Sequence, residues 1–304
     1  VVFYNLENLF DIYDDPETHD EEFLPEGVKK WNEIKYQKKL SNMERVIFDM
    51  AAIQRDYPIV IGVSEIENRS VLEDFISQPK IKGANYRICH YDSPDARGVD
   101  CAFLYRADVF KLEGSDNIKL EVEGLPNFRT RDLVVMWGTI EGEPFYFLVS
   151  HWPSRLGGKE ASQFKRDACA KQIREIKDSL LAQNPATKVI VMGDFNDDAT
   201  DPSLEKIMGA KGKVKDLQKG DFFNPFVQML RAGLGTLAYQ DAWNLFDNIC
   251  VTENLVNNEA GKLRIIKGKK FYGNIFNRPY MIQQEGQYKG YPLRTFVTNN
   301  FQNG

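Results

Sequence analysis

Short β-rich runs recur through this 304-residue chain, and they constrain its fold more than any other feature. Branched and aromatic residues dominate each run and turn-forming residues bound it, as is typical of strands in a sheet. The runs are Val1–Tyr4, Ile59–Ser64, Tyr86–Tyr91, Val99–Tyr105, Leu133–Ile140, Pro144–Ser150, Lys188–Met192 and Asn248–Thr252. The pattern therefore predicts a substantial system of β-sheet.

Two amphipathic helices are predicted between these runs. Apolar residues recur every three or four positions from Leu40 to Ile53 and from Phe164 to Leu180, so each helix has one apolar face. The elements do not alternate strictly, and the runs around Gly142 indicate an antiparallel hairpin. We therefore predict an α/β (α+β) fold, a four-layered α/β sandwich in which two mixed β-sheets pack face to face and are flanked by helices.

The chain contains no internal repeat, low-complexity linker or composition break. Layered sheet enzymes of this length often fold around one core, so we expect a single domain over residues 1–304. The chain opens inside the apolar run Val1–Tyr4 without an initiator methionine. We therefore expect its extreme N-terminus to be missing.

Composition limits the classes of function. A net charge of −5 argues against a protein that binds nucleic acid through a broad basic surface. It does not exclude a nuclease, because bound cations attract phosphate at a carboxylate-rich site. The four cysteines are far apart and form no metal-binding pair, so buried thiols are expected instead of a zinc site. No run reaches the roughly 18 apolar residues that a membrane-spanning helix needs.

Polar residues able to bind a metal or a phosphate follow four of the predicted strands. Asn5 follows the first run, Glu65 ends the second and His151 follows a later hydrophobic strand. Asp194 and Asn196 lie on a glycine turn after another strand. Side chains at strand ends gather at one rim of a sheet. The four segments together therefore predict one site.

Each residue alone has an ordinary structural explanation. Asn5 could satisfy a loop backbone, Glu65 could begin a helix, and His151 could be a packed core histidine. Asp194 and Asn196 could form a turn or cap a helix. The occurrence of four such strand ends in one order is what favours a functional site.

In this order the motifs resemble the signature of the endonuclease/exonuclease/phosphatase superfamily, which includes deoxyribonuclease I. They are Asn5, Ser64-Glu65, Ser150-His151-Trp152-Pro153-Ser154 and Gly193-Asp194-Phe195-Asn196. Further segments also resemble family positions: Arg97-Gly98-Val99-Asp100, Arg131-Asp132 and Phe246-Asp247-Asn248-Ile249. The resemblance, closest to bacterial members, covers residues 1 to about 252.

The resemblance implies a role for each matching residue. Glu65 is expected to bind Mg²⁺ or Mn²⁺, assisted by Asn5, because both ions prefer hard oxygen ligands. Asp194 is expected to orient and deprotonate the attacking water, and His151 to bind the phosphate or share in proton transfer. Asn196 is expected to hold a phosphoryl oxygen.

Five further residues are expected to support these. Asp100 is a predicted partner that orients His151, and Asp247 resembles an aspartate that orients a second catalytic histidine in the family. Arg131, Arg97 and Arg155 are predicted phosphate contacts, although an arginine beside an aspartate is equally often a surface pair.

One family element is absent from the sequence. The family closes with a serine-aspartate-histidine element before its last strand, and no histidine follows His151 here. The segment from Gly290 to Phe296 resembles the stretch that precedes this element, and the chain stops at Asn303-Gly304. We therefore expect the last strand to be missing; the alternative is a genuine loss.

The sequence leads us to predict a metal-dependent hydrolase of phosphodiesters, most of all a nuclease acting on nucleic acid. The basic residues Arg97, Arg155, Lys159, Lys165 and Arg166 could line a phosphate-tracking groove, although a charged helix face is usually solvated. An inositol-phosphate phosphatase or other small-phosphoester phosphatase is the alternative. A non-catalytic binding module follows if the closing pair is truly absent.

Two properties stay open at this level. A monomer is the default expectation. A secreted or periplasmic location is favoured, because the start of the chain is missing and because bacterial relatives are exported. A sequence trimmed at its start would look the same.

Overall fold

The computed structural model describes residues 1–257 and 261–302 and divides the chain into two compact units. Unit 1 comprises residues 1–110, 129–131 and 276–304, and unit 2 comprises residues 111–128 and 132–275. Asn303 and Gly304, at which the given sequence stops, lie outside the described residues.

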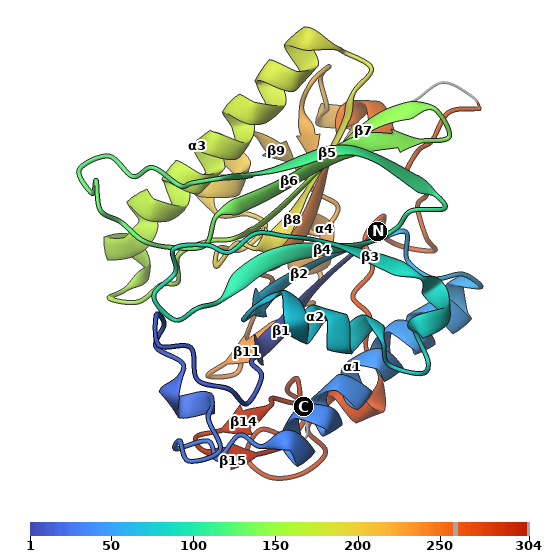
Figure 1. Cartoon of the computed structure of the whole chain (residues 1–304). Coiled ribbons are helices and arrows are strands. Elements are labelled where there is room, and N and C mark those ends of the chain that lie inside the picture. The colour runs from blue at the N-terminus through green and yellow to red at the C-terminus, as the bar shows by residue number, and fades with distance from the viewer. Residues whose placement is uncertain (258–260, 303–304) are drawn as a thin grey trace. The chain divides into compact units, whose positions relative to one another are not determined.

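Unit 1 is built on a four-stranded sheet with the order β1-β2-β4-β3. β1 runs parallel to β2, and β4 runs antiparallel to both β2 and β3, so the sheet is mixed. Its strands are β1 (Val2–Leu9), β2 (Val60–Ile66), β3 (Tyr86–His90) and β4 (Asp100–Arg106). The ends of β1 and β2 lie next to each other, because these two strands are parallel neighbours (Figure 1).

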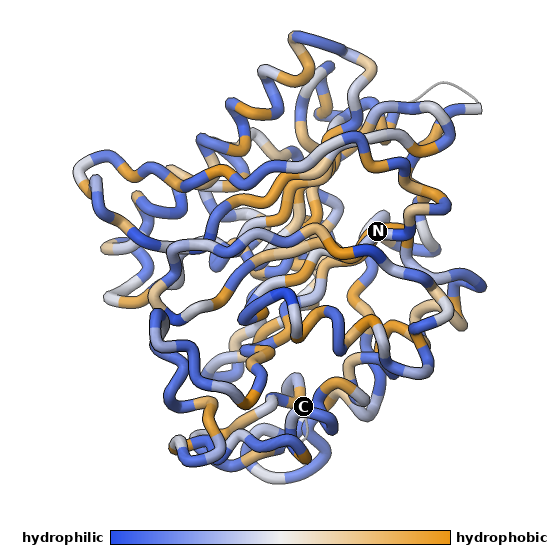
Figure 2. The backbone as a smooth tube through the Cα atoms, viewed as in Figure 1, coloured by the Kyte–Doolittle hydropathy of each residue, from blue (hydrophilic) through white to orange (hydrophobic). Residues whose placement is uncertain are grey.

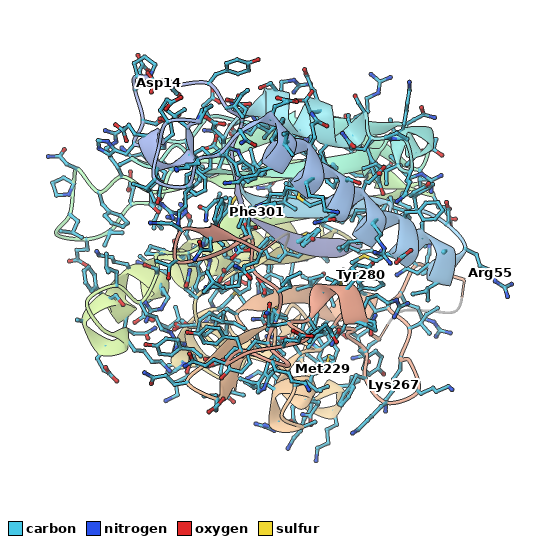
Figure 3. All side chains as sticks on the ribbon, turned by 90° about the horizontal axis from the view of Figure 1, so that it is seen from below. Asp14, Arg55, Met229, Lys267, Tyr280 and Phe301 are labelled. Atoms are coloured by element: carbon cyan, nitrogen blue, oxygen red, sulfur yellow. The ribbon has the colours of Figure 1, made fainter. Side chains whose placement is uncertain are left out.

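Helices α1 (Glu33–Gln54) and α2 (Arg69–Ile76) pack on this sheet. Each begins at an asparagine cap: Asn32 accepts the N–H of Lys35, and Asn68 accepts the N–H of Val71. α1 ends where Arg55 adopts a left-handed conformation, and Figure 3 shows its side chain projecting from the helix end. Apolar residues of both helices and of β1, β2 and β4 form one core cluster.

Unit 2 contains a seven-stranded sheet with the order β5-β6-β7-β8-β13-β10-β9. β7 and β8 run parallel, whereas β6 pairs antiparallel with β7 and β13 pairs antiparallel with β8. Its strands are β5 (Phe110–Ile118), β6 (Leu133–Ile140), β7 (Glu143–His151), β8 (Lys188–Asp194), β9 (Ala210–Lys211), β10 (Phe222–Phe223) and β13 (Asp247–Thr252). A separate hairpin consists of β11 (Leu237–Tyr239) and β12 (Ala242–Asn244).

The long helix α3 (Lys159–Gln183) packs on this sheet, and the short helix α4 (Val227–Arg231) lies further along the chain. Cys169, Ala170 and Ile173 of α3 contribute to a buried cluster with apolar residues of β6, β7 and β8. Figure 2 shows the central strands of the sheet as largely hydrophobic and α3 as alternating between hydrophobic and hydrophilic residues. The alternation matches a helix with one face against the sheet.

The C-terminal segment of unit 1, residues 276–302, docks through aromatic side chains. It contains the small hairpin β14 (Phe296–Val297) and β15 (Asn300–Phe301). The ring of Phe301, labelled in Figure 3, lies 6.0 Å from Trp31 and 5.7 Å from Phe296. Tyr280, also labelled, donates to Asp49 of α1 at 2.8 Å.

The structure confirms the predicted mixed α/β class with two mixed sheets, and each of the eight predicted runs overlaps a strand. The sequence reading missed β5, a strand at the edge of its sheet with mostly polar side chains. It also missed α2, which has only eight residues. Ile53 and Phe164 were assigned to the apolar faces of α1 and α3, but they are 58% and 47% exposed.

The four cysteines are buried and free, as the sequence predicts. Within the described part of the chain, no helix is long and apolar enough to cross a bilayer.

Candidate active site

Glu65 and Asn5 lie side by side on neighbouring strands of unit 1, since Asn5 of β1 pairs with Ser64 of β2. The Asn5 amide nitrogen lies 3.5 Å from Glu65 Oε1, and the N–H of Asn8 donates to Glu65 Oε2 at 3.0 Å. Asn5 Oδ1 accepts the N–H of Glu7 at 2.8 Å. The irregular part of β1, between Asn5 and Leu9, therefore contacts both oxygens of the Glu65 carboxylate.

The backbone carrying these groups is irregular. Glu65 has a φ of 59°, at a shift in register between Ser64 and Ile66. Glu7 and Asn8 have φ values of 48° and 59° at a second shift. A side chain in this left-handed region costs about 1–3 kcal/mol unless its surroundings hold it, and such strain concentrates at functional sites. No sequence pattern predicted this feature.

Lys39 of α1 contacts the same irregular part of β1 from a buried position. Its Nζ donates to the carbonyl oxygen of Glu7 and to Thr295 Oγ1 at 3.0 Å. Burial lowers the pKa of Lys39 to about 8, while the negative charges of Glu7 and Glu65 act in the opposite direction. The sequence reading missed Lys39, because a lysine in a charged helix carries no signal of burial.

Arg97 and Arg131, two predicted phosphate contacts, share one carboxylate. Arg131 Nη1 donates to Asp95 Oδ2 at 3.0 Å, and both side chains are 8% exposed. Arg97 Nε lies 3.6 Å from Asp95 Oδ1. Asp132, the neighbour that the sequence suggested as the alternative partner of Arg131, accepts from Asn117 at 2.8 Å.

Asp100 contacts residues that the sequence reading did not assign. His90 Nε2 lies 2.9 Å from Asp100 Oδ2, and the N–H of Ser93 donates to Oδ1 at 2.9 Å. The role of Asp100 toward His151 therefore stays a prediction. His90, Asp92 and Asp100 have ligand atoms within 4.8 Å of one another, but the Asp92 side chain is 92% exposed. The His90–Asp100 hydrogen bond accounts for this group without a metal.

In unit 2, His151, Asp194 and Asp247 occupy matching positions on three adjacent strands. Asp194 at the end of β8 pairs with His151 of β7 on one side and with Asp247 of β13 on the other. His151 Nε2 lies 3.8 Å from Asp194 Oδ2. The strand pairing thus brings an imidazole and two carboxylates to one end of the sheet.

The turn after β8 explains the glycine and the asparagine of its motif. A Cβ on Gly193 would lie 1.8 Å from the carbonyl oxygen of Ser150, so only glycine allows this approach of β7 and β8. Asn196 has a φ of 51°, donates from Nδ2 to the carbonyl oxygen of Trp152 at 2.9 Å, and donates its N–H to Asp194 Oδ1 at 3.0 Å. The amide keeps one N–H for another acceptor.

Arg155, a third predicted phosphate contact, is bound to this turn. Its Nε donates to the carbonyl oxygen of Asn196 at 2.7 Å, and Nη2 donates to Asp201 at 2.9 Å and to Asp197 at 3.3 Å. The guanidinium also lies 4.4 Å from the centre of the Phe246 ring. These contacts favour a role in holding the Asn196 turn over a direct contact with substrate.

A buried ion pair supports the turn from α3. Arg166 and Asp197 are both fully buried, and Arg166 Nε lies 2.8 Å from Asp197 Oδ1. Ser203 and Gln163 donate to Asp197 Oδ2 at 2.6 and 3.0 Å. The sequence reading placed Arg166 on a groove or a solvated face; the structure places it in the interior.

The predicted site residues thus form two groups. Unit 1 carries Asn5, Glu65, Arg97, Asp100 and Arg131, and unit 2 carries His151, Arg155, Asp194, Asn196 and Asp247. The donor set at Glu65 fits Mg²⁺ or Mn²⁺, because it offers a carboxylate and an amide oxygen, the hard ligands that both ions prefer.

A model of the endonuclease/exonuclease/phosphatase family matches residues 1–304. The chain belongs to this family. The family chemistry is hydrolysis of phosphoric esters with a divalent metal, so this chain is identified as a phosphoesterase of that group. No curated protein matches the sequence.

Solved structures of the same fold have little sequence in common with this family member. The mannosyl-6-phosphatase of Bacteroides thetaiotaomicron has a TM-score of 0.52 at 18% identity, with 83% of this chain and 84% of that chain covered. The catalytic domain of human Nocturnin, with a bound sulfate, has a TM-score of 0.51 at 16% identity, with 71% and 76% covered. Another family protein from B. thetaiotaomicron has a TM-score of 0.51 at 18% identity, with 83% and 80% covered.

Proposed function

We propose that this chain is a Mg²⁺- or Mn²⁺-dependent hydrolase whose substrate is a small phosphorylated molecule. Glu65, with Asn5 beside it, holds the ion, which when bound polarises the phosphate and offsets its negative charge. Asp194 orients and deprotonates the attacking water. His151 binds the phosphate or shares in the proton transfer, and the spare N–H of Asn196 holds a phosphoryl oxygen.

The observation that favours a small substrate is the pairing of the basic residues. Of the five that the sequence assigned to a phosphate-tracking groove, four contact carboxylates. Arg97 contacts Asp95, Arg155 and Lys159 contact Asp201, and Arg166 contacts Asp197. A protein that follows a nucleic acid strand needs cations that neutralise successive phosphates. Cations already paired, in a chain of net charge −5, provide little of this attraction.

A panel of substrates tests the proposal. It contains sugar phosphates, an inositol polyphosphate, bis-p-nitrophenyl phosphate, plasmid DNA and RNA, each with Mg²⁺ or Mn²⁺. Sugar phosphates come first because one protein of similar structure is a mannosyl-6-phosphatase. We expect metal-dependent turnover of a small phosphoester, and we expect it to be lost in Glu65→Gln but kept in the exposed control Glu26→Gln.

The nuclease that the sequence favoured is the competing proposal. Lys165 supports it, because its amino group lies 4.8 Å from the centre of the Phe128 ring and has no carboxylate partner among the described residues. Faster cleavage of DNA or RNA than of every small phosphoester, with a rate that falls steeply as salt rises, would establish the nuclease. Tight metal binding without turnover of any substrate would instead support the binding module.

Arg155→Lys separates a positioning role from substrate binding. Lysine keeps the charge but loses the fork that contacts Asn196, Asp197 and Asp201. Because misplacement of a reacting group by about 1 Å can cost about 100-fold, we expect kcat to fall by up to about 100-fold with KM nearly unchanged. Steady-state kinetics on the substrate found above measures both. A rise in KM without a change in kcat would instead show that Arg155 contacts the substrate.

A further inference from the structure

The Glu65 carboxylate depends on the backbone of the irregular part of β1, between Asn5 and Leu9. The N–H of Asn8 donates to Glu65 Oε2 at 3.0 Å, and Asn8 holds this position in a left-handed conformation, as does Glu7 before it. Two consecutive residues of this kind require contacts that keep them in place. The contacts come from two segments that are distant in the sequence.

The first segment is α1, through Lys39. The buried Nζ donates to the carbonyl oxygen of Glu7, and it lies 3.5 Å from the carbonyl oxygen of Asn8. The ammonium group therefore joins two successive carbonyl oxygens of the irregular part of β1. Its third contact, with Thr295 Oγ1 at 3.0 Å, leads to the C-terminal segment.

The second segment holds the Glu7 side chain. The N–H and the hydroxyl of Thr295 both donate to Glu7 Oε2, at 2.8 and 3.0 Å. Arg294 Nε lies 3.3 Å from Glu7 Oε1. The Thr295 hydroxyl accepts from Lys39 and gives its only proton to Glu7, so every one of these contacts is chemically compatible.

Thr295 is fixed in position by its neighbours in the same hairpin. It is 3% exposed, and its carbonyl oxygen accepts the N–H of Gln302 at 2.9 Å. Phe296, the next residue, lies 5.8 Å from Trp31 and 6.3 Å from Phe23, ring centre to ring centre. The C-terminal segment is thus anchored independently of the part of β1 that it contacts.

We infer that Glu7, Lys39 and Thr295 form a positioning group that sets the affinity of the Glu65 metal site. The inference rests on the proposed role of Glu65. None of the three is proposed as a metal ligand; together they hold the Asn8 N–H against the Glu65 carboxylate, which would bind the ion. The C-terminal segment, more than 200 residues away in the sequence, thereby becomes part of the metal site.

Direct measurement of Mn²⁺ binding by calorimetry tests the inference without a substrate. Thr295→Val and Glu7→Gln are expected to weaken Mn²⁺ binding by about 10- to 100-fold, the usual effect of losing a group that orients a metal ligand. Thr295→Ser keeps the hydroxyl and is expected to bind Mn²⁺ like the unchanged protein. The controls are Thr298→Val, in the same hairpin, and Glu21→Gln, which is exposed.

The kinetic signature separates positioning from a loss of folding. At saturating Mn²⁺ the kcat of Thr295→Val is expected to lie within about twofold of the unchanged protein, with only the Mn²⁺ requirement raised. Mn²⁺ affinity equal to that of the unchanged protein in both Thr295→Val and Glu7→Gln would overturn the inference, provided that Glu65→Gln still loses the ion. If Glu65→Gln also binds Mn²⁺ normally, the proposed metal site itself is wrong.

Discussion

Asp194→Asn is expected to lower kcat by about 10²- to 10⁴-fold, the range over which a general base contributes. Asparagine keeps an oxygen for the N–H of Asn196, which donates to Asp194 Oδ1 at 3.0 Å, so the turn stays in place. It loses the negative charge that accepts the proton of water. Single-turnover rates on the substrate identified above, with Mn²⁺ binding measured in parallel, give the comparison.

The matched control for this variant is Asp216→Asn, an exposed aspartate of the same unit. Its kcat is expected to stay within about twofold of the unchanged protein, as for most surface substitutions. A kcat in Asp194→Asn within a few-fold of normal would show that another group deprotonates the water. His151, the register partner of Asp194, would then be the next candidate.

Arg166→Met is expected to lower the free energy of unfolding by about 3–5 kcal/mol, because it removes the fully buried partner of Asp197 and leaves this buried carboxylate the longer contact with Arg155, at 3.3 Å. Arg166 is fully buried and also donates to Ser162 Oγ at 2.8 Å, to the carbonyl oxygen of Lys159 at 2.9 Å and to Gln163 Oε1 at 3.0 Å. Urea denaturation, followed by circular dichroism, measures the change.

Two comparisons make the Arg166 result specific. Arg174→Met, on the same helix but 51% exposed, is expected to change stability by about 0.5 kcal/mol or less. The double variant Arg166→Met with Asp197→Leu removes both charges and is expected to recover part of the loss. A single variant as stable as the unchanged protein would mean that Arg155 or water compensates the charge of Asp197.

These ion pairs also indicate which class of substrate the site favours. The acidic residues that follow β8 hold the turn that carries Asn196, and they do so by engaging Arg155, Lys159 and Arg166. Cations engaged in this way position a catalytic turn and contribute little to long-range attraction of a polyanion. The same feature therefore supports both the stability prediction and the preference for a small phosphoester.

The strands and the strand-end motifs could be predicted because they depend on local sequence. β-rich runs bounded by turn residues favour strands, and the order of Asn5, Glu65, His151 and Asp194 along those strands indicated the family. Gly193 is part of this local information, because its lack of a side chain is what permits the approach of Ser150. The edge strand β5 was missed because few of its residues are buried.

The partners of charged side chains were decided by the tertiary structure alone. A lysine or arginine in a helix carries the same local pattern whether it is solvated or buried, so the sequence did not reveal that Lys39 contacts Glu7 or that Arg166 contacts Asp197. Contacts such as Glu7 with Thr295 join residues 288 positions apart. The sequence by itself therefore determined the strands and the family. Which basic side chains pair with carboxylates, and which can contact a substrate, was decided by the tertiary structure, because burial and long-range pairing exist only in the folded chain.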